Sequence, residues 1–246
     1  MANIINLLKR QLRAYFYSPL AYVIMLAFLP TAGLSFCRSL EQHLGRQIGV
    51  GELLFGASGF WVAVLAAVAL LTMPLFAEER RSGTLEMLLT MPVTDLQVVL
   101  GKYAGAFGFF LLLTLPTLSF FVLLQVLAPG LAALEPAPIL GGYLILWLIG
   151  GCLIGAGMLI SALTRSPITA AGVSFLVIGL FFFLDSASAL VPGEAARNAL
   201  AYLASAQHIQ DFAQGIVDTR PVALYLSLAL FFVFATVKVL EARQWK

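Results

Sequence analysis

Charge is scarce in this sequence. Charged residues make up 11% of the 246 residues, whereas hydrophobic residues make up 61%. A soluble domain carries about 25% charged and roughly 45–50% apolar residues, so this chain lacks the polar groups to cover a water-facing surface. Its expected solvent is a lipid bilayer. The formal net charge is only +2 and no basic cluster is interleaved with aromatic residues, which argues against binding to nucleic acid.

The residue types on which most catalytic chemistry depends are also few. Cys37 and Cys152 lie in separate apolar runs, and their spacing indicates neither a disulfide nor a metal site. His43 and His208 have no second histidine, cysteine or carboxylate at ligand spacing. The motifs GxSxG and GxxxxGK[ST] are absent, so the sequence predicts neither a serine-hydrolase site nor a phosphate-binding loop. We therefore expect a chain that is not an enzyme and binds no cofactor.

Long apolar runs dominate what is present. A helix needs about 20 apolar residues to cross the hydrocarbon core, and helices are favoured because lipid offers no partner for a bare backbone N–H or C=O. The sequence thus predicts one all-α integral membrane domain over residues 1–246, with kinks at Pro30 and Pro116. Its six transmembrane helices are expected at residues 20–36, 58–77, 101–127, 139–163, 168–191 and 221–240.

Lysine and arginine indicate the orientation. Ten of the fourteen fall in one alternating set of segments between the predicted spans, which places that set and both termini in the cytoplasm. These ten residues are Lys9, Arg10, Arg13, Arg80, Arg81, Lys102, Arg165, Lys238, Arg243 and Lys246. The other set contains Arg38, Arg46, Arg197 and Arg220.

Residues 1–19 have the pattern of an amphipathic helix. Apolar residues such as Ile4, Leu8 and Tyr15 share one helical face, and Lys9 and Arg10 lie on the opposite face. Such a helix suits the inner membrane surface, where the basic face meets anionic lipid. The alternative is a frayed cytoplasmic tail, which the regularity of the stripe disfavours.

Two charges lie inside apolar runs, Asp185 near the outer end of the fifth span and Lys238 near the inner end of the sixth. An intramembrane charge is a functional candidate by default. Both are close enough to a boundary to reach water, so we favour a structural role for each. Gly151 and Gly155 form a small-xxx-small pair, for which helix packing within the chain is favoured over a subunit interface.

The segment 78–97 after the second span is different. Two acids and two bases are followed by Gly83, which permits a sharp turn, and then by a short amphipathic helix that Pro92 ends. A capped cytoplasmic helix of this kind can seat in a groove of a soluble partner and transmit its movement. The sequence supports equally the alternative that this segment is a connector lying on the lipid surface.

The run EERRSGTLEMLLTMPVTDLQVVLGKY at residues 78–103 closely resembles the coupling segment of ABC type-2 exporter permeases, above all of the subgroup associated with gliding motility. The runs GMLISALTRSPITAAGVSF and SAQHIQDFAQGIVDTRPVALYLSLALFFVFATVKVLEAR, at residues 157–175 and 205–243, are similar to the same subgroup. The resemblance covers essentially the whole chain.

This resemblance implies a permease subunit of a bacterial cytoplasmic (inner) membrane transporter. Two such subunits, identical or related, would form the pathway, and a separate ATPase subunit would bind ATP and magnesium. An auxiliary membrane protein with an extracytoplasmic domain could join them. The resemblance also implies that coupling-segment residues stand at or near the ATPase contact. These are Glu78, Glu79, Arg81, Gly83, Thr84, Glu86 and Leu89.

Residues 192–220 resemble a short extracytoplasmic helical element that partly covers the outer mouth of the pathway. Its polar residues Gln207, His208, Gln210 and Asp211 could equally form a solvated face. The expected function is export of an unidentified substrate, driven by ATP hydrolysis on the partner. The alternative is an ATP-driven mechanotransmitter that acts on an extracytoplasmic partner and carries nothing across.

Overall fold

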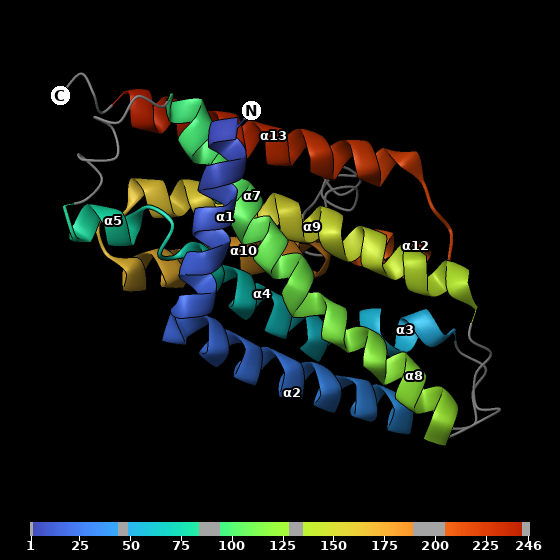
Figure 1. The fold of residues 1–246 in the computed structure, drawn as a ribbon. Helices are drawn as coiled ribbons and strands as arrows, with labels where there is room; N and C mark the ends of the chain where they lie inside the picture. The colour runs from blue at the N-terminus through green and yellow to red at the C-terminus, as the bar shows by residue number, and fades with distance from the viewer. Residues whose placement is uncertain (1, 44–48, 84–93, 128–134, 189–204, 243–246) are drawn as a thin grey trace.

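The computed structural model describes residues 2–43, 49–83, 94–127, 135–188 and 205–242, and all regular structure in them is helical. Figure 1 shows the arrangement. The elements are α1 (Ala2–Tyr17), α2 (Pro19–Gln42), α3 (Val50–Phe55), α4 (Ser58–Thr72), α5 (Ala77–Arg81), α7 (Asp95–Thr114), the 3₁₀ turn η1 (Leu115–Thr117), α8 (Leu118–Leu127), α9 (Pro136–Leu163), α10 (Pro167–Ser188), α12 (Ser205–Ala213) and α13 (Thr219–Glu241).

Five helical segments are long and apolar enough to cross a membrane. They are Pro19–Gln42, Ser58–Arg81, Asp95–Val126, Pro136–Leu163 and Thr219–Glu241. The apolar part of α10, Pro167–Leu180, is shorter than these five segments and is not among them. The all-helical membrane fold expected from the sequence is therefore confirmed, with five of the six predicted spans meeting the length and composition of a span.

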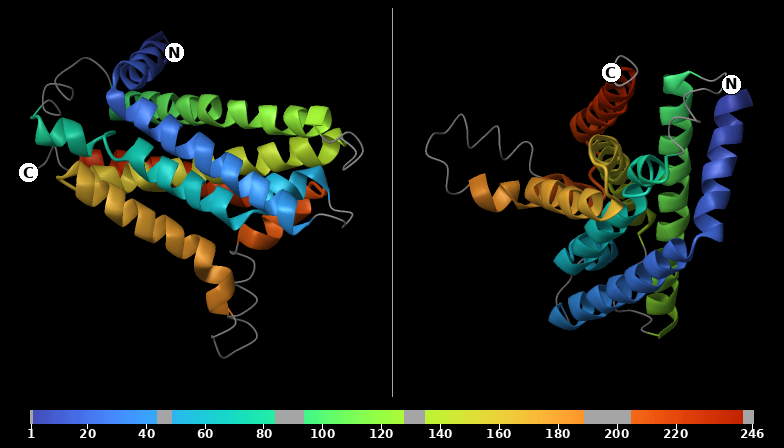
Figure 2. Two further views of the ribbon diagram at one scale, coloured as in Figure 1. Left: turned by 90° about the horizontal axis from the view of Figure 1, so that it is seen from below. Right: turned by 90° about the vertical axis from the view of Figure 1, so that its left-hand side faces the viewer.

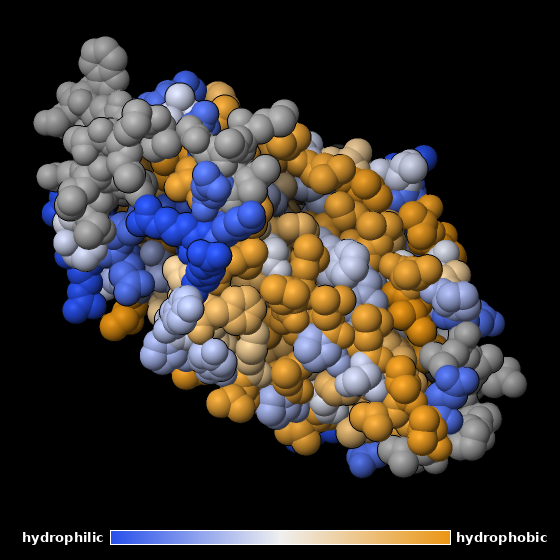
Figure 3. All heavy atoms as spheres, in the orientation of Figure 1, coloured by the Kyte–Doolittle hydropathy of each residue, from blue (hydrophilic) through white to orange (hydrophobic). Residues whose placement is uncertain are grey.

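The long helices run back and forth along one axis (Figure 1). The beginning of α1, the end of α13 and the short α5 lie at one end of the molecule, and α3 and α12 lie at the other (Figures 1 and 2). Helix α10 diverges from the others toward its C-terminal end (Figure 2). Apolar side chains cover most of the face in Figure 3, and hydrophilic ones gather at the end where α1 and α5 lie.

Helix α9 lies at the centre and packs against α4, α7, α10, α12 and α13. Its glycines make this packing possible, because a Cβ on Gly157 would lie 2.3 Å from the hydroxyl of Thr72 on α4. Gly151 faces Tyr103 of α7, and Gly155 faces Phe232 of α13. Both members of the small-residue pair therefore pack against helices of the same chain, and α9 holds the end of α4 at close range.

Two prolines differ in their effect on the helices. Pro116 lies in η1, between α7 and α8, where its missing N–H and its ring interrupt the α-helical ladder. The expected break in the third span thus takes the form of one 3₁₀ turn. Helix α2 continues through Pro30 from Pro19 to Gln42.

Helix α1 occupies the region of the predicted amphipathic helix. It ends before Ser18, whose hydroxyl caps α2 by accepting a hydrogen bond from the backbone N–H of Leu20 at 3.3 Å. Helix α1 packs along α7, where Gly105 leaves room for the side chain of Gln11 (Figure 2). The short helix α3 was not predicted, although Leu54 and Phe55 within it are fully buried.

Candidate functional site

The second span is broken at its end. The sequence predicted one span over 58–77, but α4 ends at Thr72 and a turn at residues 73–76 leads into α5. Pro74 accounts for this break, because proline donates no backbone hydrogen bond and its ring clashes with the preceding turn. Residues 73–83, called the joint below, comprise this turn, α5 and the two residues after it. Because the joint leaves the helical ladder, its buried backbone groups need other partners.

The hydroxyl of Ser161 on α9 is the partner of three of these backbone groups. Its hydroxyl oxygen accepts hydrogen bonds from the backbone N–H groups of Phe76 and Ala77, both at 3.1 Å. The same hydroxyl donates to the backbone carbonyl of Met73 at 3.0 Å. Ser161 is fully buried, so one side chain fixes both sides of the turn to the central helix.

Lys102 of α7 holds the joint from a second helix. Its ammonium group lies 2.7 Å from a carboxylate oxygen of Glu79 and donates to the carbonyl of Leu75 at 2.5 Å. It also lies 4.9 Å from the ring centroid of Phe76. The side chain of Lys102 is only 8% exposed and that of Glu79 is 24% exposed. A buried ammonium is tolerated here because an opposite charge and a carbonyl surround it.

Helix α1 and the link after α9 also reach this region. The hydroxyl of Tyr15 donates to the carbonyl of Leu71 at 2.9 Å, at the end of α4. The guanidinium of Arg80 donates to the carbonyl of Thr164 at 3.4 Å. The end of the second span is therefore connected by polar contacts to α1, α7, α9 and the link after α9.

The predicted contact residues separate into distinct environments. Glu78, Arg81 and Gly83 are exposed, whereas Glu79 turns inward to Lys102. Gly83 has a φ of +71°, which an L side chain rarely adopts, and a Cβ there would meet no atom within 4 Å. Thr84, Glu86 and Leu89 lie outside the described residues.

The sequence did not predict a role for Ser161 or Pro74, and Lys102 was counted only among the cytoplasmic cations. Pro74 could have been read as a helix break. Nothing marked Ser161, because one serine in an apolar helix is unremarkable. Lys238 pairs with Glu241 at 2.7 Å in an exposed position, in agreement with a structural role. Helix α10 includes Asp185, whose side chain lies outside what is described.

At the opposite end, α12 lies within the predicted extracytoplasmic element. His208 is only 8% exposed, and its Nδ1 lies 3.2 Å from the hydroxyl of Tyr225 on α13. Gln207 and Gln210 are exposed, and Asp211 is half-buried. The four polar residues therefore do not form one solvated face. Burial lowers the pKa of His208, and the carboxylates of Asp211 and Asp218 partly oppose this effect.

Mild acid should destabilise the packing of α12. The unfolded chain takes up a proton near pH 6.5, whereas folded His208, with its lowered pKa, does so only at lower pH. The stability that neutral His208 contributes is thus present above pH 6.5 and falls as the pH drops below it. Thermal unfolding between pH 7.5 and 5 measures this, and His208→Gln should flatten the dependence. An unchanged slope in that variant would assign the pH dependence to other groups.

Among the described residues, no three His, Cys, Asp or Glu side chains lie close enough to hold a metal ion. The joint is a short polar segment that is fixed to α7 through Lys102 and to α9 through Ser161. A family model described as "ABC-2 family transporter protein" matches residues 45–237. The chain belongs to this family. A search of curated proteins finds no match.

Membership identifies the chain as the membrane domain of an ABC transporter, a multi-pass permease subunit. In the ABC-2 family the ATPase and the permease are in general separate, and the permeases pair. The matched region begins after α2 and ends within α13, so it includes the whole joint with Lys102 and Ser161.

Proposed function

We propose that this chain is the membrane-spanning subunit of an ATP-driven exporter, and that the joint receives the movement of a separate ATPase subunit. The observation that carries the proposal is the double attachment of the joint, through Ser161 to α9 and through Lys102 to α7. The buried backbone groups of the turn need partners in any case, but the ion pair with Lys102 in addition fixes α5 itself to a second helix. Such a double attachment suits a segment that bears force, because a loose segment would dissipate the movement before it reached the helices.

The proposed complex contains two permease subunits in a bacterial inner membrane, with ATP and magnesium bound by the ATPase. All six predicted spans would cross the membrane, including α10, and both termini would face the cytoplasm. This orientation puts the exposed residues Glu78, Arg81 and Gly83 within reach of a cytoplasmic protein. Closure of the ATPase dimer would then tilt the permease halves as rigid bodies. Assignment to the gliding-associated subgroup rests on the three runs quoted above.

Gly83→Ala should weaken the stimulation of ATP hydrolysis by the permease about fivefold, because a left-handed backbone costs an alanine about 1 kcal/mol or more. The cost is conformational only, since a Cβ at this position meets no atom within 4 Å. Gly172→Ala on α10 is the matched control, because a Cβ there also meets nothing and its φ is not positive. The measurement is substrate-stimulated ATP turnover of the reconstituted complex.

The same reconstitution tests the proposal as a whole. If the Gly83→Ala complex assembled and hydrolysed ATP as the wild type does, the joint would not be the coupling element. Uptake of a labelled substrate into inverted vesicles then separates export from a complex that only transmits force to an outer partner. Failure of any ATPase subunit to co-purify with the chain would overturn the proposed function itself.

A further inference from the structure

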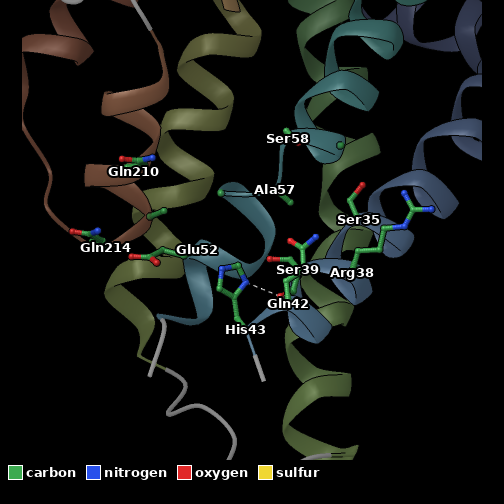
Figure 4. A pocket seen from close by; sticks show the side chains of 13 residues that line it. Ser35, Arg38, Ser39, Gln42, His43, Glu52, Ala57, Ser58, Gln210 and Gln214 are labelled. Atoms are coloured by element: carbon green, nitrogen blue, oxygen red, sulfur yellow. Dashed lines mark hydrogen bonds between the residues drawn. The ribbon is translucent and has the colours of Figure 1, made fainter. Parts of the chain in front are cut away.

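A polar cavity of about 660 Å³ opens at the end of the molecule opposite the joint. Three elements distant in sequence build it: the end of α2, the α3–α4 region and α12 (Figure 4). Its charged, imidazole and amide side chains are Arg38, Gln42, His43, Glu52, Gln210 and Gln214. This concentration of polar groups stands out in a chain with so little charge. Gln210, which the sequence analysis had weighed as a possible solvated residue, lines this cavity.

The cavity continues into an apolar groove. Helices α2 and α4 enclose a second space of about 480 Å³, lined by residues from Ile24 to Arg38 on one side and from Ser58 to Leu70 on the other. The two spaces share Ser35, Arg38, Ser58 and Gly59. From Ile24 to Ser35 the groove follows roughly 16 Å of helix at 1.5 Å per residue. That length accommodates an extended hydrocarbon chain.

The hydroxyl groups in the groove do not make its wall polar. Thr31 donates to the carbonyl of Phe28 at 3.2 Å, and Ser35 donates to the carbonyl of Thr31 at 2.7 Å. Both hydrogens are therefore used within α2. The remaining lining is largely alanine, leucine, valine and phenylalanine. A ligand in the groove meets an apolar surface, and a ligand in the cavity meets a polar one.

The charges in the cavity have opposite signs and are not paired with each other. Among the described residues, neither Arg38 nor Glu52 forms an ion pair, so both charges are available to a ligand. His43 lies between their elements, and its Nδ1 is 2.7 Å from the carbonyl of Ser39, which can only accept (Figure 4). Nδ1 is thus the donor, and the Nε2 of the neutral ring is an acceptor.

We propose that the cavity and groove together bind an amphiphilic cargo with a zwitterionic head group. The acidic part of the head would pair with Arg38, whose guanidinium suits phosphate or carboxylate. The basic part would lie toward Glu52 and the Nε2 acceptor of His43, and the hydrocarbon chain would fill the groove between α2 and α4. This inference rests on the proposed export function and names its substrate class.

The probe is a lysophosphatidylethanolamine with a photoreactive diazirine in its acyl chain. The full chain is placed in nanodiscs of phosphatidylglycerol, whose head group lacks a basic part. We expect crosslinks on α2 and α4. Arg38→Gln and Glu52→Gln should each weaken binding about tenfold, through loss of one charged contact each. Ala66→Phe should weaken it at least as much, because Ala66 is half-buried and lines the groove.

Two matched controls lie outside both spaces. Arg220→Gln removes an exposed arginine at the start of α13, and Ala235→Phe enlarges a half-buried alanine of the same helix. Both should leave binding unchanged, and thermal unfolding of every variant checks that the fold is kept. If Glu52→Gln tightened binding, Glu52 would repel the phosphate of the probe instead of holding its ammonium, and the proposed preference for a zwitterion would be wrong. If the variants at Arg38, Glu52 and Ala66 bound as the controls do, the site would not exist.

ATP turnover of the complex with its ATPase distinguishes cargo from a resident lipid. A cargo should raise turnover in the wild type but not in Ala66→Phe. Binding with no change in turnover would overturn the assignment as cargo and leave a structural lipid site. Because crosslinking uses the permease alone, its outcome does not depend on whether the ATPase partner proposed above exists.

Discussion

Lys102→Met should lower the free energy of unfolding by about 3 kcal/mol, because removal of one partner of a buried ion pair leaves the other charge poorly solvated. Glu79 retains some contact with water, which puts the value at the low end of the usual range. The variant also removes the hydrogen bond to the Leu75 carbonyl and the contact with the Phe76 ring. Thermal unfolding of the purified permease in detergent measures the loss.

Lys238→Met provides a close control. The Lys238–Glu241 pair has the same separation of 2.7 Å, but its side chains are 56% and 42% exposed. A solvent-exposed pair contributes about 0–1 kcal/mol, so this variant should change the free energy of unfolding very little. Adding Glu79→Gln to Lys102→Met should recover part of the stability by removing the buried negative charge that has lost the ammonium of Lys102. Equal losses from the two lysine variants would mean that Lys102 is hydrated and does not hold the joint.

Ser161→Ala should destabilise the chain by about 2–3 kcal/mol. The substitution leaves the N–H groups of Phe76 and Ala77 and the carbonyl of Met73 without their partner in a buried site. Each orphaned group costs about 1–3 kcal/mol in a soluble protein, and intramembrane hydrogen bonds average about 0.6 kcal/mol. The total cost expected for the three groups therefore lies between the sums that these two per-group values give. The variant should also reduce coupling, measured as substrate-stimulated ATP turnover.

Ser174→Ala is its natural comparison. Ser174 on α10 is likewise fully buried, but its hydroxyl has no hydrogen-bond partner among the described residues. Removal of an unsatisfied hydroxyl should be neutral or slightly stabilising. If the two serine variants behaved alike, the bonds to residues 73–77 would contribute nothing and the joint would be held by packing alone.

The apolar runs predicted the helices well because the bilayer imposes both their length and their conformation. The starts of α2 and α13 fall within two residues of the expected spans, and in each case a capping side chain in the sequence sets the position. Of the polar segment predicted at residues 78–97, residues 78–83 fall in the joint, whereas residues 84–93 lie outside the described residues. The family expected from the residues of that segment is the family that the comparison supports.

Tertiary contacts account for what the sequence analysis missed. The role of Lys102 depends on Glu79, 23 residues away, and that of Ser161 on a turn more than 80 residues away. Neither has a local pattern. The polar cavity has no local pattern either, because Arg38, Glu52 and Gln210 meet only when α2, α3 and α12 fold together. Helix α3 was overlooked because six residues are too few for a periodic signal.

The interruption of the helical ladder at Pro74 has a consequence for how force divides within the subunit. A continuous helix would carry a push on α5 directly along α4. In the proposed mechanism the stiff backbone path stops here, and the side chains of Ser161 and Lys102 would carry the push sideways into α9 and α7. Helix α4, which forms one wall of the groove, would then move only after α7 and α9 have moved. Substitutions that uncouple the two ends of the protein should accordingly concentrate on α7 and α9 and spare α4.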